Sequence, residues 1–378
     1  MSTIKTNAIL DASGGNTTTI NGATPTAYNT MGKNRIINGA MEIDQRNAGA
    51  SGTLAHGSLT YAVDRWNVYE NTPVTNSTYQ QVSDAPANFS YSLKYTNGTA
   101  GGSATSTQNA RIQQRIEGYN FADLMYGTSD ARTITISFWV KSSLTGTYCV
   151  ALHNSTTLES YVTEYAINSA NTWEQKTVTI PGNTSGTWLT TNEIGLSVGF
   201  TLSCGSARTT STADTWTSGQ IYQATSNQID FTATTGATFY LTGVQLEVGS
   251  VATEFERRPY GTELALCQRY CVVISGAGTT ASSSPVASGY CVGTTNFYVP
   301  YVFKVTPRTP PTGISVTNPT SFTCAFGAAS NPSAINFTGG SFEGCFMQAV
   351  ITGGTGGYGG VMYMNNTNAK IEITGMEL

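Results

Sequence analysis

The chain has 378 residues, of which 11% are charged, and its formal net charge is −4. Soluble domains usually carry roughly 25% charged residues, so the polar surface here must come from Thr, Ser, Asn and Gln. The lack of a Lys/Arg cluster argues against a nucleic-acid groove, and no apolar run approaches the ~18 residues of a membrane span. Abundant Gly and Tyr with almost no Ala-Leu-Glu-Lys texture predict an all-β chain.

Residues 1–32 contain few apolar residues and no lasting hydrophobic period. Such a segment cannot bury enough apolar surface to fold alone, and an ordered terminus of this kind has to be held by a partner. We therefore predict an extended N-terminal attachment arm. Its candidate contact residues are Ile4, Ile9, Leu10 and Ile20.

From residue 33 to about residue 260 the pattern is that of β-strands. Segment 61–66 is predicted to be one strand that enters the core through Val63 and Trp66. Further strands are predicted at 91–95, 110–116, 133–141, 148–152, 173–180, 194–200 and 239–248. This number of strands in about 225 residues predicts a two-sheet jelly roll. The polar stretch 204–230 is predicted to be a long insertion between strands.

The clearest strand is 133–141, in which side chains alternate between apolar and polar. The predicted inward residues are Ile134, Ile136, Phe138 and Val140, and the predicted outward residues are Thr133, Thr135, Ser137, Trp139 and Lys141.

The strand at 239–248 should contain a break at Gly243, because the apolar side chains change phase there. Phe239 and Leu241 precede the break, and Val244, Leu246 and Val248 follow it. Thr262 is then predicted to cap a short helix at 261–271, with Leu264, Cys267 and Cys271 on one face.

Residues 272–378 predict a smaller C-terminal β-sandwich. Pro300 lies inside the strand 296–303 and should mark an edge or a bulge, since proline cannot donate to a ladder. The stretch 353–360 places six glycines around Tyr358. It lacks the lysine of a phosphate-binding loop, so it is either a hairpin tip or a place where Tyr358 stacks on a ligand.

Three aromatic residues are candidates for glycan binding, because aromatic faces suit apolar ligand surfaces. They are Tyr358, Trp139 and Trp216; Trp173 and Trp188 are weaker candidates. The alternative for the tryptophans is that they cover the second sheet or a subunit interface.

Neither catalysis nor metal binding has a sequence signal. His56 and His153 lie apart from any nucleophile motif. The seven cysteines have an odd count and scattered spacing, which predicts free thiols. We therefore predict a non-enzyme without metal or cofactor.

Two phrases carry a family resemblance. Residues 243–270, GVQLEVGSVATEFERRPYGTELALCQRY, resemble a segment of bacteriophage fibre and spike proteins that closes a jelly-roll domain similar to carbohydrate-binding modules. Residues 33–41, KNRIINGAM, resemble the phrase that opens the same domain. The resemblance implies a virion structural protein with an arm (1–32), a jelly roll (33–260), a hinge helix (261–271) and a distal receptor-facing sandwich (272–378).

The expected role is a tail fibre or spike. It would be made in the host cytoplasm, incorporated in the virion and homotrimeric, and it would bind other virion proteins and a host-surface glycan. A capsid decoration (cement) or head-fibre protein and a glycan-cleaving spike remain as alternatives. The latter would need a pair of carboxylates in one cleft.

Overall fold

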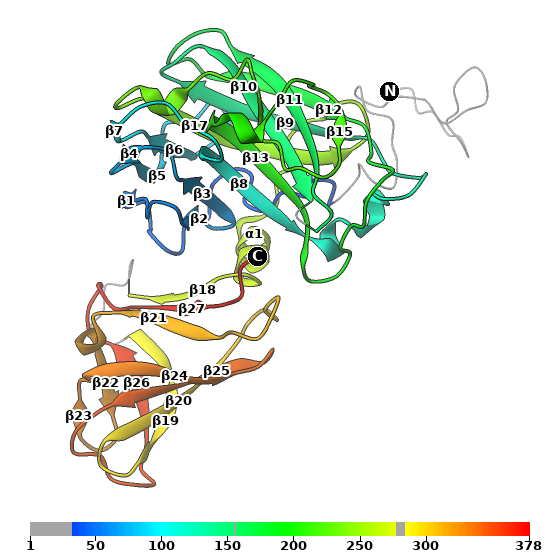
Figure 1. The fold of residues 1–378 in the computed structure, drawn as a ribbon. Helices are drawn as coiled ribbons and strands as arrows, with labels where there is room; N and C mark the ends of the chain where they lie inside the picture. The colour runs from blue at the N-terminus through cyan, green and yellow to red at the C-terminus, as the bar shows by residue number, and fades with distance from the viewer. Residues whose placement is uncertain (1–31, 155, 277–283) are drawn as a thin grey trace, which may run out of the picture.

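The computed structural model describes residues 32–154, 156–276 and 284–378. Within these ranges the chain is all-β, apart from helix α1 (Tyr260–Gln268) and short 3₁₀ turns. Two β-sandwiches lie on either side of α1 (Figure 1). No helix in this part of the chain is long and apolar enough to cross a membrane. The predicted arm contacts lie outside the described residues: Ile4, Ile9, Leu10 and Ile20.

The first sandwich consists of two main antiparallel sheets that enclose one hydrophobic core, as in a jelly roll. In spatial order, the six-stranded sheet contains β1 (Gly52–Thr53), β5 (Thr78–Val82), β6 (Ser92–Thr96), β17 (Thr238–Val248), β9 (Ile134–Ser142) and β12 (Glu174–Ile180). The seven-stranded sheet contains β15 (Trp216–Thr217), β11 (Glu159–Ile167), β10 (Gly146–Asn154), β13 (Ile194–Cys204), β8 (Asn109–Glu117), β3 (Trp66–Glu70) and β2 (Leu59–Val63).

Two short strand pairs complete this sandwich. They are β4 (Val74–Thr75) with β7 (Thr99–Ala100), and β14 (Thr209–Thr210) with β16 (Ala224–Thr225). The second pair belongs to the segment 204–230, which was predicted to be a polar insertion. Ala224 of this segment packs on Cys149 and Val162. The segment therefore covers part of the outer face of the seven-stranded sheet.

The phase change predicted at Gly243 is confirmed. Gly243 has φ +60° and lies in a β-bulge where the register of β17 against β9 shifts. A bulge adds one residue to one strand, so the side chains after it change face. Leu241 before the bulge and Val244 after it are therefore both fully buried in the same core.

Two local predictions need correction. Segment 61–66 is not one strand: β2 ends at Val63, and Arg65, with φ +70°, turns the chain into β3. Thr135 and Ser137, predicted outward, are buried at 0% and 4% exposure. The four inward residues of β9 are fully buried, as predicted: Ile134, Ile136, Phe138 and Val140.

Part of the outer face of β9 and β17 is buried because the two segments that carry the resemblance bind each other there. We call residues 33–41 and 244–258 the clasp. Asn34 is its centre: its Oδ1 accepts from the backbone N–H of Leu246 at 3.0 Å, and its Nδ2 donates to Val244 O at 3.1 Å. Its own backbone N–H donates to Glu256 Oε2 at 2.8 Å. The opening and closing segments of the sandwich are thereby joined.

The closing phrase also folds back on its own strand. Gln245 accepts from the Glu256 backbone N–H at 2.7 Å, and Glu247 accepts from both the backbone N–H and the hydroxyl of Thr253. Gln245 and Glu247 are 0% and 1% exposed, yet both are hydrogen-bonded. Their polar groups are satisfied as buried polar groups must be. The polar residues Gln245 and Glu247 of this segment therefore have a structural role.

A substitution at Gly39 tests the clasp, because the backbone of Gly39 lies against β17. A Cβ at position 39 would lie 2.2 Å from Val244 O. We expect Gly39→Ala to destabilise the fold by about 3 kcal/mol through overpacking against backbone, measured by denaturant unfolding. Gly261→Ala is the matched control, because position 261 is in α1 with open space around it. Equal midpoints for the two variants would contradict the clasp.

The second sandwich pairs a three-stranded sheet with a seven-stranded one around a separate core. The smaller sheet contains β18 (Val272–Ser275), β27 (Lys370–Thr374) and β21 (Gly313–Thr317). The larger contains β23 (Ala329–Ser330), β22 (Phe322–Ala325), β26 (Gly359–Met364), β19 (Ser284–Val292), β20 (Asn296–Val302), β25 (Gly344–Val350) and β24 (Ala334–Gly340).

Pro300 lies on β20 opposite Phe346 of β25. On its other side, β20 pairs with β19 only from Asn296 to Tyr298. Pro300 therefore lies where β20 is locally an edge, so its missing N–H costs no ladder bond. No register shift interrupts the pairing with β25.

The two sandwiches meet at α1 and at the last residues of the described chain. Cys267 and Tyr270 pack with Ile37 of the first sandwich and with Leu378. The predicted cap Thr262 is not the cap: α1 begins at Tyr260, with Pro259 at the N-cap. Cys267 is therefore buried between the sandwiches of its own chain.

Ion pairs and hydrogen bonds of charged side chains also link the two sandwiches at this junction. Glu377 accepts from Arg46 Nη2 at 3.1 Å and forms a short ion pair with Arg65. Arg308, on the connection from β20 to β21, donates to Asn192 O at 2.8 Å and to Glu377 O at 2.6 Å. The junction is thus a hydrogen-bonded interface with nearly buried arginines.

Candidate functional site: a groove at Trp139

An open groove of about 670 Å³ lies on the outer face of the six-stranded sheet, beside the clasp. Trp139 of β9 lies between Thr242 of β17 and Gln175 of β12 in the ladder. The bulge at Gly243 borders the same space, and a Cβ there would lie 3.0 Å from Trp139 Cδ1. The groove is lined by Ala87, Asn88, Phe89, Ser137, Trp139, Gln175, Gly243, Glu254, Phe255 and Arg257.

One wall of the groove is aromatic and carries a cation. Phe89 and Phe255 meet edge to face with centroids 5.1 Å apart. The Arg257 guanidinium lies 4.7 Å from the Phe89 ring centroid and donates to Asn88 O. Cation–π contact of this kind holds an exposed arginine in place. The wall therefore presents hydrogen-bond donors at a fixed position.

A second aromatic cluster lies one row further along the same sheet face. Trp173 and Tyr240 meet edge to face at 6.1 Å, and Lys141 Nζ lies 4.3 Å from the Tyr240 centroid. Asp84 accepts from Trp173 Nε1 at 3.2 Å and pairs with Lys141. The hydrogen bond from Lys141 lowers the pKa of Asp84, so the carboxylate stays ionised. Together with Trp139, this cluster extends the aromatic surface.

The chemistry offered by the groove is that of recognition. Half-buried Trp139 offers a ring face, and Gln175 and Asn88 are exposed amides that both donate and accept. Glu254 is the carboxylate among the described lining residues. Glycoside hydrolysis needs two carboxyl groups about 5 to 10 Å apart. The described lining holds one, which does not make such a pair.

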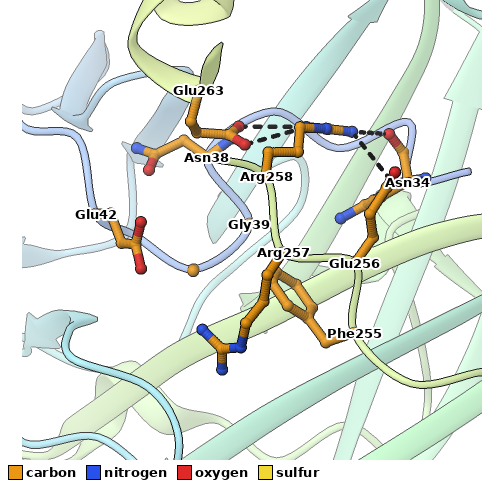
Figure 2. A pocket seen from close by; sticks show the side chains of 10 residues that line it. Asn34, Asn38, Gly39, Glu42, Phe255, Glu256, Arg257, Arg258 and Glu263 are labelled. Carbon is orange, nitrogen blue, oxygen red and sulfur yellow. Dashed lines mark hydrogen bonds and ion pairs between the residues drawn. The ribbon is translucent and has the colours of Figure 1, made fainter. Parts of the chain in front are cut away.

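A smaller pocket of about 190 Å³ shares Phe255 and Arg257 with the groove (Figure 2). Arg258 is fully engaged there: it donates to Ile36 O at 3.0 Å and to Asn34 O, and pairs with Glu263 at 3.3 Å. Glu42 points into the space across from Arg257, and burial raises its pKa. Most of the lining residues belong to the clasp, so we conclude that they stabilise the fold and do not form a ligand site.

The other predicted glycan-binding residues lie elsewhere. Trp216 of β15 is half-buried at the edge of the seven-stranded sheet, where its Nε1 donates to Pro181 O at 2.7 Å. It packs edge to face on Tyr126 and Trp188 at 5.8 and 5.6 Å. Tyr358 is 55% exposed on the second sandwich, just before β26. The structure therefore does not bring Trp139, Trp216 and Tyr358 together.

The remaining titratable groups do not form a metal or redox centre in the described part of the chain. All seven cysteines are free thiols. No cluster of three His, Cys, Asp or Glu side chains with metal-binding geometry occurs among the described residues. Burial raises the pKa of Cys149 and of Cys204 to about 11, which keeps both thiols protonated and unreactive.

Sequence reasoning found Trp139 but missed most of its groove. Phe89, Asn88 and Arg257 come from segments without strand periodicity. Gln175 could have been found, because it lies in the predicted strand 173–180 on the face opposite the buried Val178. The alternation of that strand was the available signal.

Comparisons with known proteins give the following. No family model matches the chain, and no curated protein matches it. Among solved structures, the chain is similar to a tailspike domain of bacteriophage CBA120 (14% identity, TM-score 0.30), covering 52% of this chain and 21% of that one.

It is also similar to a CBM4 module (16% identity, TM-score 0.31), covering 56% of this chain and 98% of that one. A putative sugar-binding protein from Bacteroides thetaiotaomicron (14% identity, TM-score 0.34) matches over 57% of this chain and 100% of that one. Likenesses this weak carry no argument about function.

Proposed function

We propose that the chain is a bacteriophage virion fibre or spike protein whose first sandwich binds host-surface glycan in the groove at Trp139. The observation that carries the proposal is the open groove itself, which combines Trp139 with exposed amides and Arg257. Sugar rings present C–H faces to aromatic rings and hydroxyls to amides, so this lining is complementary to a saccharide. The phrases at 33–41 and 243–270, which resemble fibre and spike proteins, support the virion assignment.

The proposed assembly is a homotrimer that attaches to the particle through residues 1–32 and carries no catalytic activity. Three copies would bind a repetitive polysaccharide at the same time, so avidity would compensate for a weak single site. Capture of particle proteins by the full chain and by a chain lacking residues 1–32 tests the attachment. Deletion should abolish capture of a tail protein; capture of the major capsid protein would favour a decoration role instead.

The glycan site is tested by Trp139→Ala. We expect at least a tenfold loss of affinity for purified host polysaccharide, because a central aromatic anchor behaves as a hot spot. Gln175→Ala should also weaken binding without affecting the fold, since Gln175 is exposed. Titration of the protein in solution with a short oligosaccharide of that polysaccharide, which cannot bridge two copies, would give single-site affinities.

Tyr119→Ala is the matched control, because Tyr119 is 61% exposed and lies outside the groove. Tyr358→Ala tests the second sandwich separately. Unchanged binding for both Trp139→Ala and Gln175→Ala would overturn the site, and loss with Tyr358→Ala alone would move glycan recognition to the second sandwich. Release of reducing sugar from the polysaccharide would contradict the non-enzymatic role.

A further inference from the structure

A cationic strip lies on the opposite side of the first sandwich from the Trp139 groove. Alternation along β8 places Arg111, Gln113 and Arg115 on the outer face of the seven-stranded sheet. Arg208, from the 3₁₀ turn after β13, lies near them: its charge lowers the pKa of both Arg111 and His153. We call Arg111, Arg115 and Arg208 the arginine strip.

Within the described ranges, Arg111 and Arg208 of the arginine strip have no carboxylate partner. None of its guanidinium groups forms an ion pair there. Arg111 Nε donates to Gln113 Oε1 at 2.7 Å, Arg208 Nε to Thr107 O at 3.1 Å, and Arg115 Nη1 to Leu378 O at 2.7 Å. Uncharged acceptors hold Arg111 and Arg208 in place and leave their positive charges uncompensated, whereas Arg115 lies near the charge of Glu377.

The nearest strand carboxylate in the same row is already engaged. Glu164 of β11 is three strands from Arg111 in the ladder, which is about 14 Å at the usual strand spacing. Its Oε1 accepts from Asn227 Nδ2 at 3.0 Å and from Thr225. Burial lowers the pKa of Arg111 to about 10, and Arg208 and Arg115 add to this effect. An added anion would relieve that repulsion.

Buried polar atoms without a partner lie beside the strip, which is a second and independent observation. Ser197 Oγ, Gln113 Nε2 and His153 Nδ1 have no hydrogen-bond partner, and these residues are 0%, 0% and 7% exposed. His153 and Ser197 are paired residues on β10 and β13, and Ser197 is paired with Arg115. Buried polar atoms that are left unsatisfied are costly. Gln113 Nε2 is a donor, and Ser197 Oγ and His153 Nδ1 can each donate, so their position under the guanidinium groups of the strip indicates a site for an acceptor.

We propose that the arginine strip binds an oxyanion, and that its ligand is the acidic group of a carboxylated host saccharide. This inference rests on the proposed glycan-binding function and adds a second, charge-selective site to it. Arginine suits the role because its planar fork bonds a carboxylate with two parallel donors. Arg111 is already oriented, since its guanidinium lies 4.6 Å from the Tyr69 ring centroid. The Trp139 groove would read the sugar rings, and the strip would select for acidic polymers.

The test uses two saccharide probes that differ only in charge: tetragalacturonic acid and its methyl ester. Binding to the full chain is followed by the NMR signals of the His153 ring and the Arg111 Nε–H. We expect a saturable shift with the acid, none with the ester, and weakening as salt increases. Arg208→Gln and Arg111→Gln should each weaken acid binding about tenfold, because a charge-assisted hydrogen bond is lost.

Lys304→Gln is the matched control, because it removes one exposed positive charge from the second sandwich. Arg111→Lys keeps the positive charge but loses the planar pair of donors. Its affinity for the acid should therefore lie between those of Arg111→Gln and the wild type. Equal affinities for Arg208→Gln and Lys304→Gln, or equal binding of acid and ester, would overturn the proposal. So would binding of inorganic sulfate without binding of the acid. Trp139→Ala should leave the His153 shift intact, which separates this site from the proposed groove.

Discussion

Glu377→Ala should destabilise the protein by about 3 to 5 kcal/mol, because it leaves a buried arginine without its carboxylate. Glu377 pairs with Arg65 and with Arg46, whose side chains are 1% and 10% exposed. The Arg65 guanidinium also lies 3.6 Å from the Tyr270 ring centroid and donates to Arg115 O at 2.6 Å, so protein groups enclose it. Denaturant unfolding of the full chain, followed by tryptophan fluorescence, measures the change.

Glu372→Ala is the control for this prediction. Glu372 also crosses the junction and accepts from Arg46 Nε at 2.8 Å, but its side chain is 21% exposed. Arg46 keeps Glu377 when Glu372 is removed, so we expect a loss of about 1 kcal/mol or less. Amide hydrogen exchange at residues 376–378 should rise in Glu377→Ala and stay low in the control. Equal losses for the two variants would show that Arg65 is not held by Glu377.

This junction shows what the sequence could and could not predict. The all-β class, the inward face of β9 and the bulge at Gly243 follow from alternation, which is a local signal. The arginines of the junction have no such signal: Arg46 and Arg65 meet Glu377 only because α1 and β27 return the chain to the first sandwich. Ion pairs between distant segments depend on the fold as a whole.

The errors have the same physical origin. Ser137 points outward as predicted, but it is buried, because segments outside the sheet cover a face that is often wet in a sandwich. The turn at Arg65 was missed because a left-handed residue is usually Gly or Asn, and Arg65 carries no such mark. Trp139 was singled out by alternation alone, whereas the segments that complete its groove come from loops. Loops carry sites without carrying periodicity.

Two buried groups should contribute slopes of opposite sign to the stability between about pH 4 and pH 6.5. Burial raises the pKa of Asp64 from 3.8 to about 7, although Arg46 opposes this. Burial lowers the pKa of His153 from 6.5 to about 3, and Arg111 adds to this. Above about pH 4 the unfolded Asp64 loses its proton while the folded one keeps it, so this term favours the fold less as pH rises. Below pH 6.5 His153 becomes protonated in the unfolded chain but stays neutral in the folded protein. The contribution of His153 to the free energy of unfolding therefore decreases as pH falls.

Because the two slopes have opposite signs, each should appear when the other group is removed. In Asp64→Asn, the free energy of unfolding should fall on acidification from pH 6.5 to pH 4, by up to about 1.4 kcal/mol per pH unit. In His153→Gln it should instead rise over the same range. A hydrogen bond from Lys141 lowers the pKa of Asp84. Burial opposes the shift of Glu174, but a hydrogen bond from Lys176 lowers its pKa. The stabilisation that these two carboxylates provide is lost only below about pH 4.5. Urea unfolding at half-unit pH steps measures the slopes, and parallel profiles for both variants and the wild type would show that neither group titrates abnormally.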